Sequence, residues 1–143
     1  MVALILVPLC AVDSLLTAPT VVGKGAGVIQ EDYLVLHATI AGDRLRGTMR
    51  GKSSFDWMTG PSGIGLLGVR AIIETDDGAS INVRYEARAD ITKGVGAAPG
   101  YAAPVFSTTS PGYLWLNLVQ AVGRGVIEGK RIHWDWYQVA EER

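Results

Sequence analysis

Short runs in which apolar and polar residues alternate with a period of two dominate this chain, and no long segment has the period of a helix. Residues 79–91 show the alternation most clearly, because Ile81, Val83, Tyr85 and Ala87 would share one face of a strand. The pattern predicts strands over residues 2–12, 33–40, 44–51, 66–75, 79–91, 113–123 and 131–140.

Turn signals separate these predicted strands. The sequence Asp-Asp-Gly at 76–78 lies between two β-rich runs and predicts a tight hairpin, in which Asp76 and Asp77 serve as turn formers. Gly and Pro are frequent in residues 92–104, which are expected to form a loop. A loop is also expected over residues 53–60.

About eight short antiparallel strands without a long helix predict an all-β fold. We expect residues 1–143 to form a single domain, a closed antiparallel β-barrel similar in general shape to a lipocalin or streptavidin. Closure removes the exposed strand edges that invite aggregation. An eight-stranded barrel is wide enough for a central cavity that holds one small ligand.

Composition narrows the possible partners. The 143 residues are 48% hydrophobic and 19% charged, as in a folded soluble domain, and the net charge is −1. The basic residues are scattered singly, which argues against nucleic acid and against an anionic membrane surface. The single cysteine, Cys10, permits no intrachain disulfide, is expected to be a buried thiol and fits a cytoplasmic location.

The apolar residues 1–19 are interpreted as a buried first strand, with a secretion signal as the alternative. The chain has no phosphate-binding loop, no H-E-x-x-H pair and no G-x-S-x-G motif, and His37 and His133 are far apart. We therefore expect no cofactor, no metal and no serine nucleophile.

Two aromatic–polar pairs are candidates for chemistry. Asp56 and Trp57 lie in the expected loop, where packing of the indole would exclude water, raise the pKa of Asp56 and suit it to proton transfer. The alternative is a Trp lid at the barrel end, with Asp56 capping a turn. Asn117 lies beside Trp115 in a predicted strand, which indicates a polar network or a ligand contact.

Which strand faces line the interior stays open at two places. If Ile81, Val83 and Tyr85 point inward, Arg84 and Glu86 are solvated charges on the outside. The alternative is a polar lumen in which Arg84 and Glu86 face a ligand. Further along the chain, Trp134 and Trp136 share a strand face that belongs either to the core or to a dimer surface.

Several short segments occur in an order that resembles the DUF3237 (UPF0311) family, over about residues 33–139. These segments are "GDRLRG" at 42–47, "FDW" at 55–57, "TDDGASI" at 75–81, "FSTTSPGYLWLN" at 106–117 and "WDWYQV" at 134–139. The resemblance implies a small closed β-barrel, usually a single domain that can self-associate. It also implies that some relatives act on small organic molecules without a cofactor, including by cyclisation.

The resulting hypothesis is a cofactor-independent cyclase, isomerase or lyase that acts on a small hydrophobic molecule of secondary metabolism, with a cycloaddition as one form of the reaction. A non-catalytic carrier and a structural protein with a filled barrel are the alternatives, and a homodimer or higher homo-oligomer is possible. The predicted site residues are Asp56, Tyr85 and Asn117 for catalysis and Trp57, Trp115, Arg84 and Trp136 for ligand binding.

Overall fold

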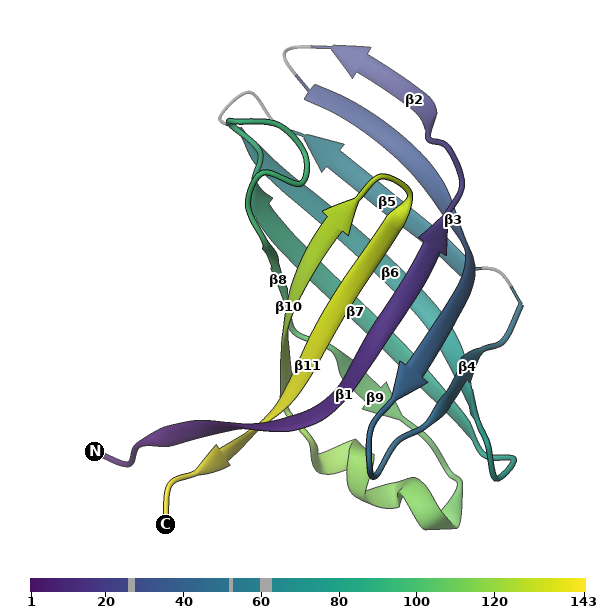
Figure 1. Cartoon of the computed structure of the whole chain (residues 1–143), viewed down its shortest axis with the longest axis vertical. Helices are drawn as coiled ribbons and strands as arrows, with labels where there is room; N and C mark the ends of the chain where they lie inside the picture. Colours follow the sequence, from purple (N-terminus) through teal and green to yellow (C-terminus); the bar gives the residue numbers. More distant parts are fainter. Residues whose placement is uncertain (26–27, 52, 60–62) are drawn as a thin grey trace.

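The computed structural model describes the backbone of residues 1–25, 28–51, 53–59 and 63–143, and the side chains of residue 28 and residues 53–59 lie outside this description. In the described chain, eleven strands join one sheet and a short 3₁₀ helix follows the ninth strand, so the all-β prediction is confirmed (Figure 1). The elements are β1 (Leu4–Leu16), β2 (Thr20–Gly25), β3 (Val28–Ala41), β4 (Gly47–Met49), β5 (Ser53–Thr59), β6 (Ile64–Thr75), β7 (Ser80–Asp90), β8 (Gly100–Ala102), β9 (Val105–Ser107), η1 (Pro111–Leu118), β10 (Ala121–Glu128) and β11 (Arg131–Glu141).

Eight of these strands are hydrogen-bonded in a ring, in the order β1–β3–β5–β6–β7–β8–β10–β11 and back to β1. The pairings in the ring are antiparallel, and the connections include the predicted β6–β7 hairpin and a second hairpin between β10 and β11. The ring makes the fold β-barrel-like, with one face of each strand turned toward a common interior (Figure 1).

The alternation in β7 places its apolar side chains inside. Ile81, Val83, Tyr85 and Ala87 are all buried, whereas Arg84 and its polar neighbours on the other face are exposed. The interpretation with apolar residues inward is therefore correct, and the polar lumen is not found. Burial of each such aliphatic side chain contributes roughly 1.5–3 kcal/mol, so the alternation fixes the strand's facing.

The β6–β7 turn has the chemistry that its sequence predicts. Gly78 has a φ of 91°, a backbone conformation that glycine adopts without steric cost. The Thr75 hydroxyl donates to Asp77 Oδ1 at 2.5 Å and accepts from the Ala79 N–H at 2.9 Å. These bonds satisfy the polar groups at the turn and hold β6 and β7 in register.

Three local predictions are wrong. Residues 113–118 belong to η1 and not to a strand, residues 53–59 form β5 and not a loop, and β8 lies within the expected loop at 92–104. Tyr113 and Leu116 of η1, and Val119 just after it, pack against the core at every third position, which is the period of a 3₁₀ helix, and Trp115 packs there as well. Pro111 at its first turn suits a helix start.

The first strand is buried only in part. Leu9 and Cys10 are buried, and burial raises the pKa of the Cys10 thiol to about 12, which confirms the expected inert thiol. Residues 4–8 are exposed, in contrast to the expected buried strand, and they project from the body with the end of β11 (Figure 1).

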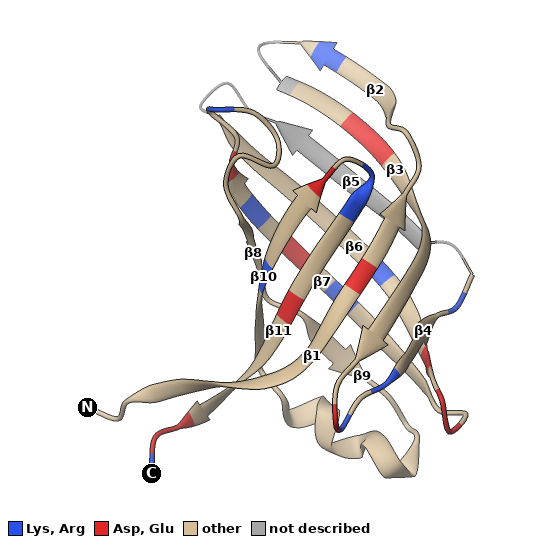
Figure 2. Cartoon of the chain, viewed as in Figure 1, with Lys and Arg blue, Asp and Glu red and all other residues tan. Residues whose placement is uncertain are grey.

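Within the described residues, no helix is long and apolar enough to cross a membrane. Acidic and basic residues are interspersed along the strands (Figure 2).

Candidate functional site

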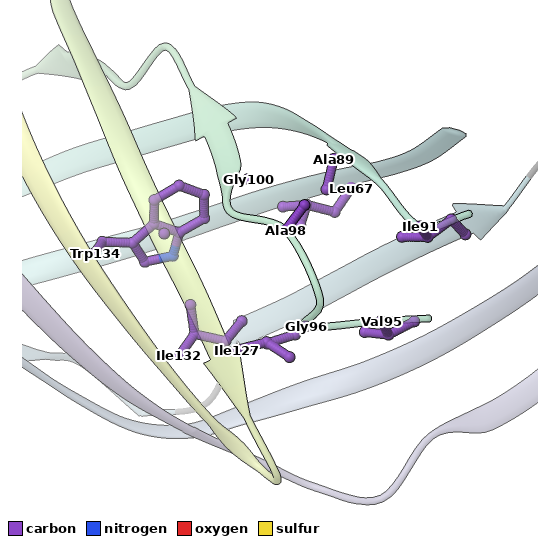
Figure 3. Close-up of a pocket in the computed structure, with 11 residues that line it drawn as sticks. Leu67, Ala89, Ile91, Val95, Gly96, Ala98, Gly100, Ile127, Ile132 and Trp134 are labelled. Carbon is purple, nitrogen blue, oxygen red and sulfur yellow. The ribbon is translucent and has the colours of Figure 1, made fainter. Parts of the chain in front are cut away.

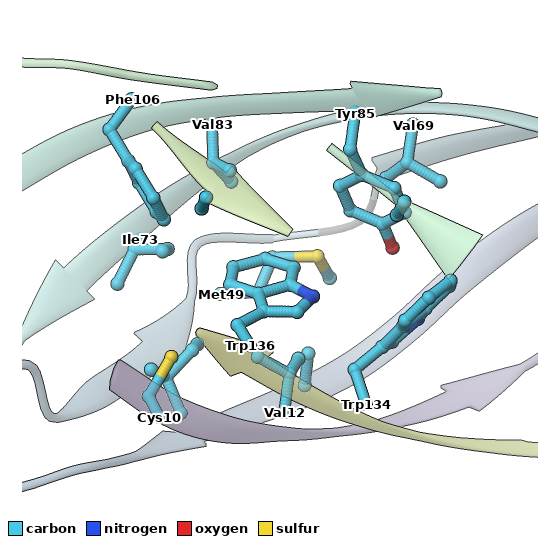
Figure 4. Packing of buried hydrophobic residues seen from close by; sticks show 14 of the residues in the cluster. Cys10, Val12, Met49, Val69, Ile73, Val83, Tyr85, Phe106, Trp134 and Trp136 are labelled. Carbon is cyan, nitrogen blue, oxygen red and sulfur yellow. The ribbon is translucent and has the colours of Figure 1, made fainter. Parts of the chain in front are cut away.

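Three aromatic side chains from two strands meet inside the ring. Tyr85 of β7 lies between Trp134 and Trp136 of β11, with ring centroids 5.5 Å apart in both pairs and interplanar angles of 69° and 72°. Figure 4 shows the Tyr85 hydroxyl directed into the space beside the two indoles. Phe106 packs edge-on against Trp136 at 5.8 Å. These edge-to-face contacts fix the orientation of the rings.

The neighbouring strand β10 makes room for the two indoles. Gly123 pairs with Trp136 and Gly125 with Trp134 across the β10–β11 ladder. A Cβ on Gly123 would lie 2.5 Å from Trp136 Cδ1, and a Cβ on Gly125 would lie 2.6 Å from Trp134 Cε3. The "GRG" of β10 and the "WDW" of β11 are therefore complementary, with a glycine opposite each inward indole.

The two indole nitrogens are buried donors without a partner. Trp134 and Trp136 are 1% and 2% exposed, and neither Nε1 has a hydrogen-bond partner among the described atoms. A buried donor left unsatisfied costs roughly 1–3 kcal/mol. Since native proteins rarely tolerate this cost, a water molecule or a bound acceptor beside the two indoles would be expected to satisfy them.

Tyr85 adds a third polar group to this interior. Burial raises the pKa of the Tyr85 hydroxyl well above its ordinary value, and a hydrogen-bond-like interaction with the Trp134 indole, too poor in geometry to satisfy its Nε1, offsets only part of this shift. The phenol therefore stays protonated and keeps a proton to donate. We call Tyr85, Trp134 and Trp136 the aromatic donor cluster.

Small cavities adjoin the aromatic donor cluster. One, of about 30 Å³, is lined by Tyr85, Trp136 and Ser14 among apolar residues. A second, also about 30 Å³, is lined by Trp134 and by the segment after β7, including Val95 and Gly96 (Figure 3). Each is large enough for water, which needs at least about 10–15 Å³, and far smaller than the ~150 Å³ of a cavity that binds benzene.

These dimensions correct one expectation. In place of one central ligand cavity, the interior bounded by described residues is largely filled by the hydrophobic core. An organic guest at the aromatic donor cluster therefore requires side chains to move and the two cavities to join.

The chemistry available to the cluster is hydrogen-bond donation in a dry, apolar environment. Its two N–H groups and one O–H group suit an oxygen acceptor such as a carbonyl, and donors in such a site act most strongly on an oxygen that gains negative charge. Among the described side chains, Ser14 and Thr75 are the fully buried polar ones. Half-buried Glu31 shares the inward side of β3 with Tyr33 and Val35 and accepts a hydrogen bond from the Tyr33 hydroxyl at 2.8 Å. The described residues contain no group of three or more His, Cys, Asp or Glu that could hold a metal.

Of the predicted site residues, the structure brings Tyr85 and Trp136 together. Trp134, which was predicted only to share a strand face with Trp136, completes the cluster, and both indoles belong to the core. The signal that could have revealed this site is the matched spacing of Gly123 and Gly125 with the two tryptophans.

Asn117 and Trp115 belong to η1, which covers one end of the ring, with Asn117 exposed and Trp115 partly buried against the core (Figure 1). The Asn117 Oδ1 accepts from the Thr108 N–H at 2.9 Å, and its Nδ2 donates to the Thr108 carbonyl at 2.9 Å. The Arg44 guanidinium lies 3.7 Å from the centroid of the half-buried Trp115 ring. The Asn117 amide is thus a clamp on a loop, and Trp115 is a platform for Arg44.

Arg84 faces away from the interior. It is exposed, pairs with Arg70 across the β6–β7 ladder and borders an open outer depression that includes Gly68. A ligand inside the ring therefore does not meet Arg84.

Asp56 and Trp57 occupy the middle of β5 in place of the predicted loop. The backbone register sets Asp56 opposite Asp32 and Gly68. The side chains of Asp56 and Trp57 lie outside the described residues, so their predicted roles stay predictions.

The family model described as "protein of unknown function (DUF3237)" matches residues 5–139. The chain belongs to this family. This match confirms the resemblance to DUF3237 that the short motifs indicated, and it covers nearly the whole length of this chain. No protein of curated function matches it in sequence.

Solved structures share this fold. A β-barrel-like protein of Acinetobacter baumannii AYE is 25% identical, with a TM-score of 0.82 and coverage of 96% of this chain and 97% of the other. A protein with unknown function from Clostridium acetobutylicum is 19% identical, with a TM-score of 0.87 and coverage of 95% and 99%. An enzyme from Penicillium herquei is 23% identical, with a TM-score of 0.73 and coverage of 96% and 94%.

Proposed function

We propose that this DUF3237 protein is a cofactor-independent enzyme that binds a small hydrophobic molecule inside a closed β-barrel and catalyses a cyclisation, isomerisation or lyase-type step. The observation that carries the proposal is the pair of buried, unpartnered indole N–H groups beside the Tyr85 hydroxyl. That a fold neighbour from Penicillium herquei is called an enzyme is consistent with it.

In this proposal the donor cluster holds an oxygen of the substrate. Trp134 and Trp136 donate through Nε1, and Tyr85 donates through its hydroxyl, to a carbonyl oxygen that gains negative charge as bonds rearrange. Preorganised donors of this kind need no reorientation during the reaction, and loss of one typically costs about 10²–10³ in kcat. Apolar walls around the oxygen would hold the carbon skeleton in a reactive shape.

Substrate would enter at the end of the barrel lined by Val95 and Gly96, next to the Trp134 cavity. Gly94 and Gly96 both have positive φ values, so this segment has a backbone that few other residues adopt without strain. Movement of this segment and of the Tyr85 ring would join the two small cavities into one site.

The rival function is a carrier that binds the same molecule without converting it. It is favoured by the absence of a fully buried carboxylate or imidazole among the described side chains, because proton transfer usually needs such a group. Asp56 stays the candidate proton donor for the enzyme.

Untargeted mass spectrometry tests the proposal. The wild-type protein is incubated with an apolar metabolite extract, and depletion, product formation and protein-bound compounds are measured. We expect an oxygen-containing apolar compound to be converted, and Tyr85→Phe to slow conversion about 100-fold or more while binding persists. The matched control is Tyr101→Phe, since Tyr101 is exposed on the outer face.

Three outcomes decide between the functions. Binding without conversion by the wild-type protein supports the carrier and contradicts the enzyme. Equal rates for Tyr85→Phe and wild type contradict the role of the donor cluster. A normal rate for Asp56→Asn removes Asp56 from the mechanism and leaves the cluster in place.

A further inference from the structure

The projecting end of β1 exposes four consecutive apolar side chains. Leu4, Ile5, Leu6 and Val7 are 66%, 40%, 54% and 39% exposed. They pair with the end of β11, from Leu4 with Glu141 to Val7 with Gln138, and form a two-stranded ribbon outside the barrel-like body (Figure 1). We call residues 1–8 with residues 137–141 the terminal arm.

A bulge directs the terminal arm away from the body. Pro8 pairs with Tyr137 and Cys10 with Trp136, so Leu9 is an extra residue in β1, and bulges bend a strand and increase its twist. Leu9 is itself buried, and Gly42 packs against it so closely that a Cβ there would lie 2.2 Å from the Leu9 carbonyl oxygen. The direction of the arm is therefore set by packing at its base.

The β1 half of the arm is apolar on both faces. Leu4 and Leu6 share one face with Val139 and Glu141 of β11, and Ile5 and Val7 share the other with Gln138 and Ala140. No charged residue precedes Asp13 in the sequence, and the projecting part of β1 carries no charge in Figure 2. A two-stranded ribbon by itself is at best marginally stable in water, so a further strand beside this one would stabilise it.

The arm also has an open edge. Within the described residues, β1 pairs with β3 only from Ala11 to Leu16, so the backbone of Leu4–Val7 on that side has no strand beside it. Natural proteins protect such edges with lysine, a bulge or a covering segment. Residues 4–7 of this edge carry no charge. The bulge and Pro8 lie at the base of the arm and not within residues 4–7, so the backbone of these residues can still pair with another strand.

We propose that the occupant is a second copy of this chain, with the two β1 arms paired antiparallel edge to edge about a two-fold axis. An edge that pairs antiparallel with its own symmetry mate forms an isologous interface, in which each copy supplies the same surface. The side chains of Leu4, Ile5, Leu6 and Val7 are 39–66% exposed, so pairing of the two arms would remove apolar surface from water on both copies. A groove of about 350 Å³ at the base of the arm, lined by Pro8, Arg44 and Tyr137, can receive side chains of the other arm.

A membrane is the weaker candidate for the occupant. Surfaces that bind anionic lipid carry clusters of Lys and Arg, whereas the arm has acidic Glu141 beside its apolar face and Arg143 at the chain end. Pairing with a second copy satisfies the backbone groups of the open edge, which lipid does not.

Light scattering after gel filtration tests the interface with the full-length chain. We expect wild type to have twice the 15.2 kDa mass of one chain, and Leu4→Lys/Leu6→Lys to have the mass of one chain with an unchanged circular dichroism spectrum. The matched control is Leu66→Lys/Ile72→Lys, which changes two similarly exposed apolar residues on the outer face of β6 and should stay dimeric.

Single-cysteine crosslinking keeps the proposal testable if the lysine variant fails to fold. Leu4, Ile5, Leu6 and Val7 are replaced by Cys one at a time, and each protein is oxidised. We expect covalent dimers for the positions nearest the two-fold axis and none for wild type, because Cys10 is buried.

A monomeric wild type, a lysine variant that stays dimeric, or oxidation without covalent dimers would each overturn the proposal. Sedimentation of the wild-type monomer with phosphatidylcholine vesicles would assign the arm to lipid instead.

Discussion

At the scale of single residues, Tyr85 is the group whose environment departs furthest from water. Its ring is held between two indoles and its hydroxyl lies among apolar side chains. Burial raises its pKa above the ordinary value of 10.0. The folded protein therefore binds the Tyr85 proton more tightly than the unfolded chain does.

The first prediction concerns alkaline stability. Because the folded-state pKa is raised, the stabilisation is complete below pH 10 and is lost as the pH rises toward the folded pKa. We expect the free energy of unfolding to fall by up to about 1.4 kcal/mol per pH unit above pH 10, and more slowly in Tyr85→Phe. Urea unfolding at pH 9 to 11.5 measures this, and equal slopes in both proteins would contradict the assigned burial.

The second prediction concerns the glycines of β10. Gly125→Ala places a methyl group against the Trp134 ring, and we expect a loss of about 1–3 kcal/mol of stability with a changed tryptophan emission. The control is Gly68→Ala in β6, where a Cβ meets no described atom within 4 Å. Similar unfolding midpoints for the two variants would show that the indole does not need the space.

A surface histidine provides a third prediction. Asp13 Oδ1 lies 2.7 Å from His133 Nδ1, and Asp135 Oδ1 lies 3.1 Å from Nε2. Hydrogen bonding to Asp13 in particular raises the pKa of His133 above 6.5. The resulting stabilisation is present below pH 6.5 and is lost as the pH rises through the folded pKa. NMR titration should show a lower pKa in Asp13→Asn, and an unchanged pKa would rule out this pairing.

Residue-scale reasoning from the sequence succeeded where one face of a strand is buried. The inward set of β7 follows from alternation alone, since a slip of one residue would bury Arg84 in place of Val83. The role of Trp134 was not predicted, because alternation shows which residues share a face and not which of their polar atoms lack partners.

At the scale of elements, η1 covers one end of the barrel-like body (Figure 1). It is held by side chains from other segments, as Tyr113 donates to Asp77 Oδ1 at 2.8 Å and Asn117 clamps Thr108. The bonds that Asp77 accepts, from Thr75 first and then from Tyr113, lower its pKa.

The fourth prediction concerns these attachments. In Tyr113→Phe the bond to Asp77 is lost, and we expect faster amide hydrogen exchange in residues 113–118 with little change in β7. The matched control is Tyr101→Phe, which removes an exposed hydroxyl of β8 and should leave exchange in η1 as in wild type. Unchanged exchange in both variants would show that other contacts hold η1.

The errors at the element scale have physical causes. Residues 113–118 alternate Leu and larger residues as a strand does, but the cation–π contact of Arg44 with Trp115 and the burial of Leu116 favour a helical turn at one end of the ring. Residues 53–59 contain polar and glycine-flanked positions that suit a loop, and pairing with β3 and β6 on both sides makes them a strand.

At the scale of the whole molecule, the short strands and hairpins predicted the all-β fold, but β5 and β8 of the ring lie in segments that were expected to be loops. The filled interior and the projecting terminal arm were not predictable. Both depend on how side chains from distant strands pack, and the alternation of one strand carries no information on the volume that remains between them.

The central claim is that the aromatic donor cluster holds an oxygen of a guest. The most direct measurement is a high-resolution crystal structure of the protein as purified. The account predicts an organic guest that joins the two cavities and has an oxygen at about 3 Å from an indole nitrogen of Trp134 or Trp136. An interior in which both nitrogens face only carbon atoms of the protein would contradict it.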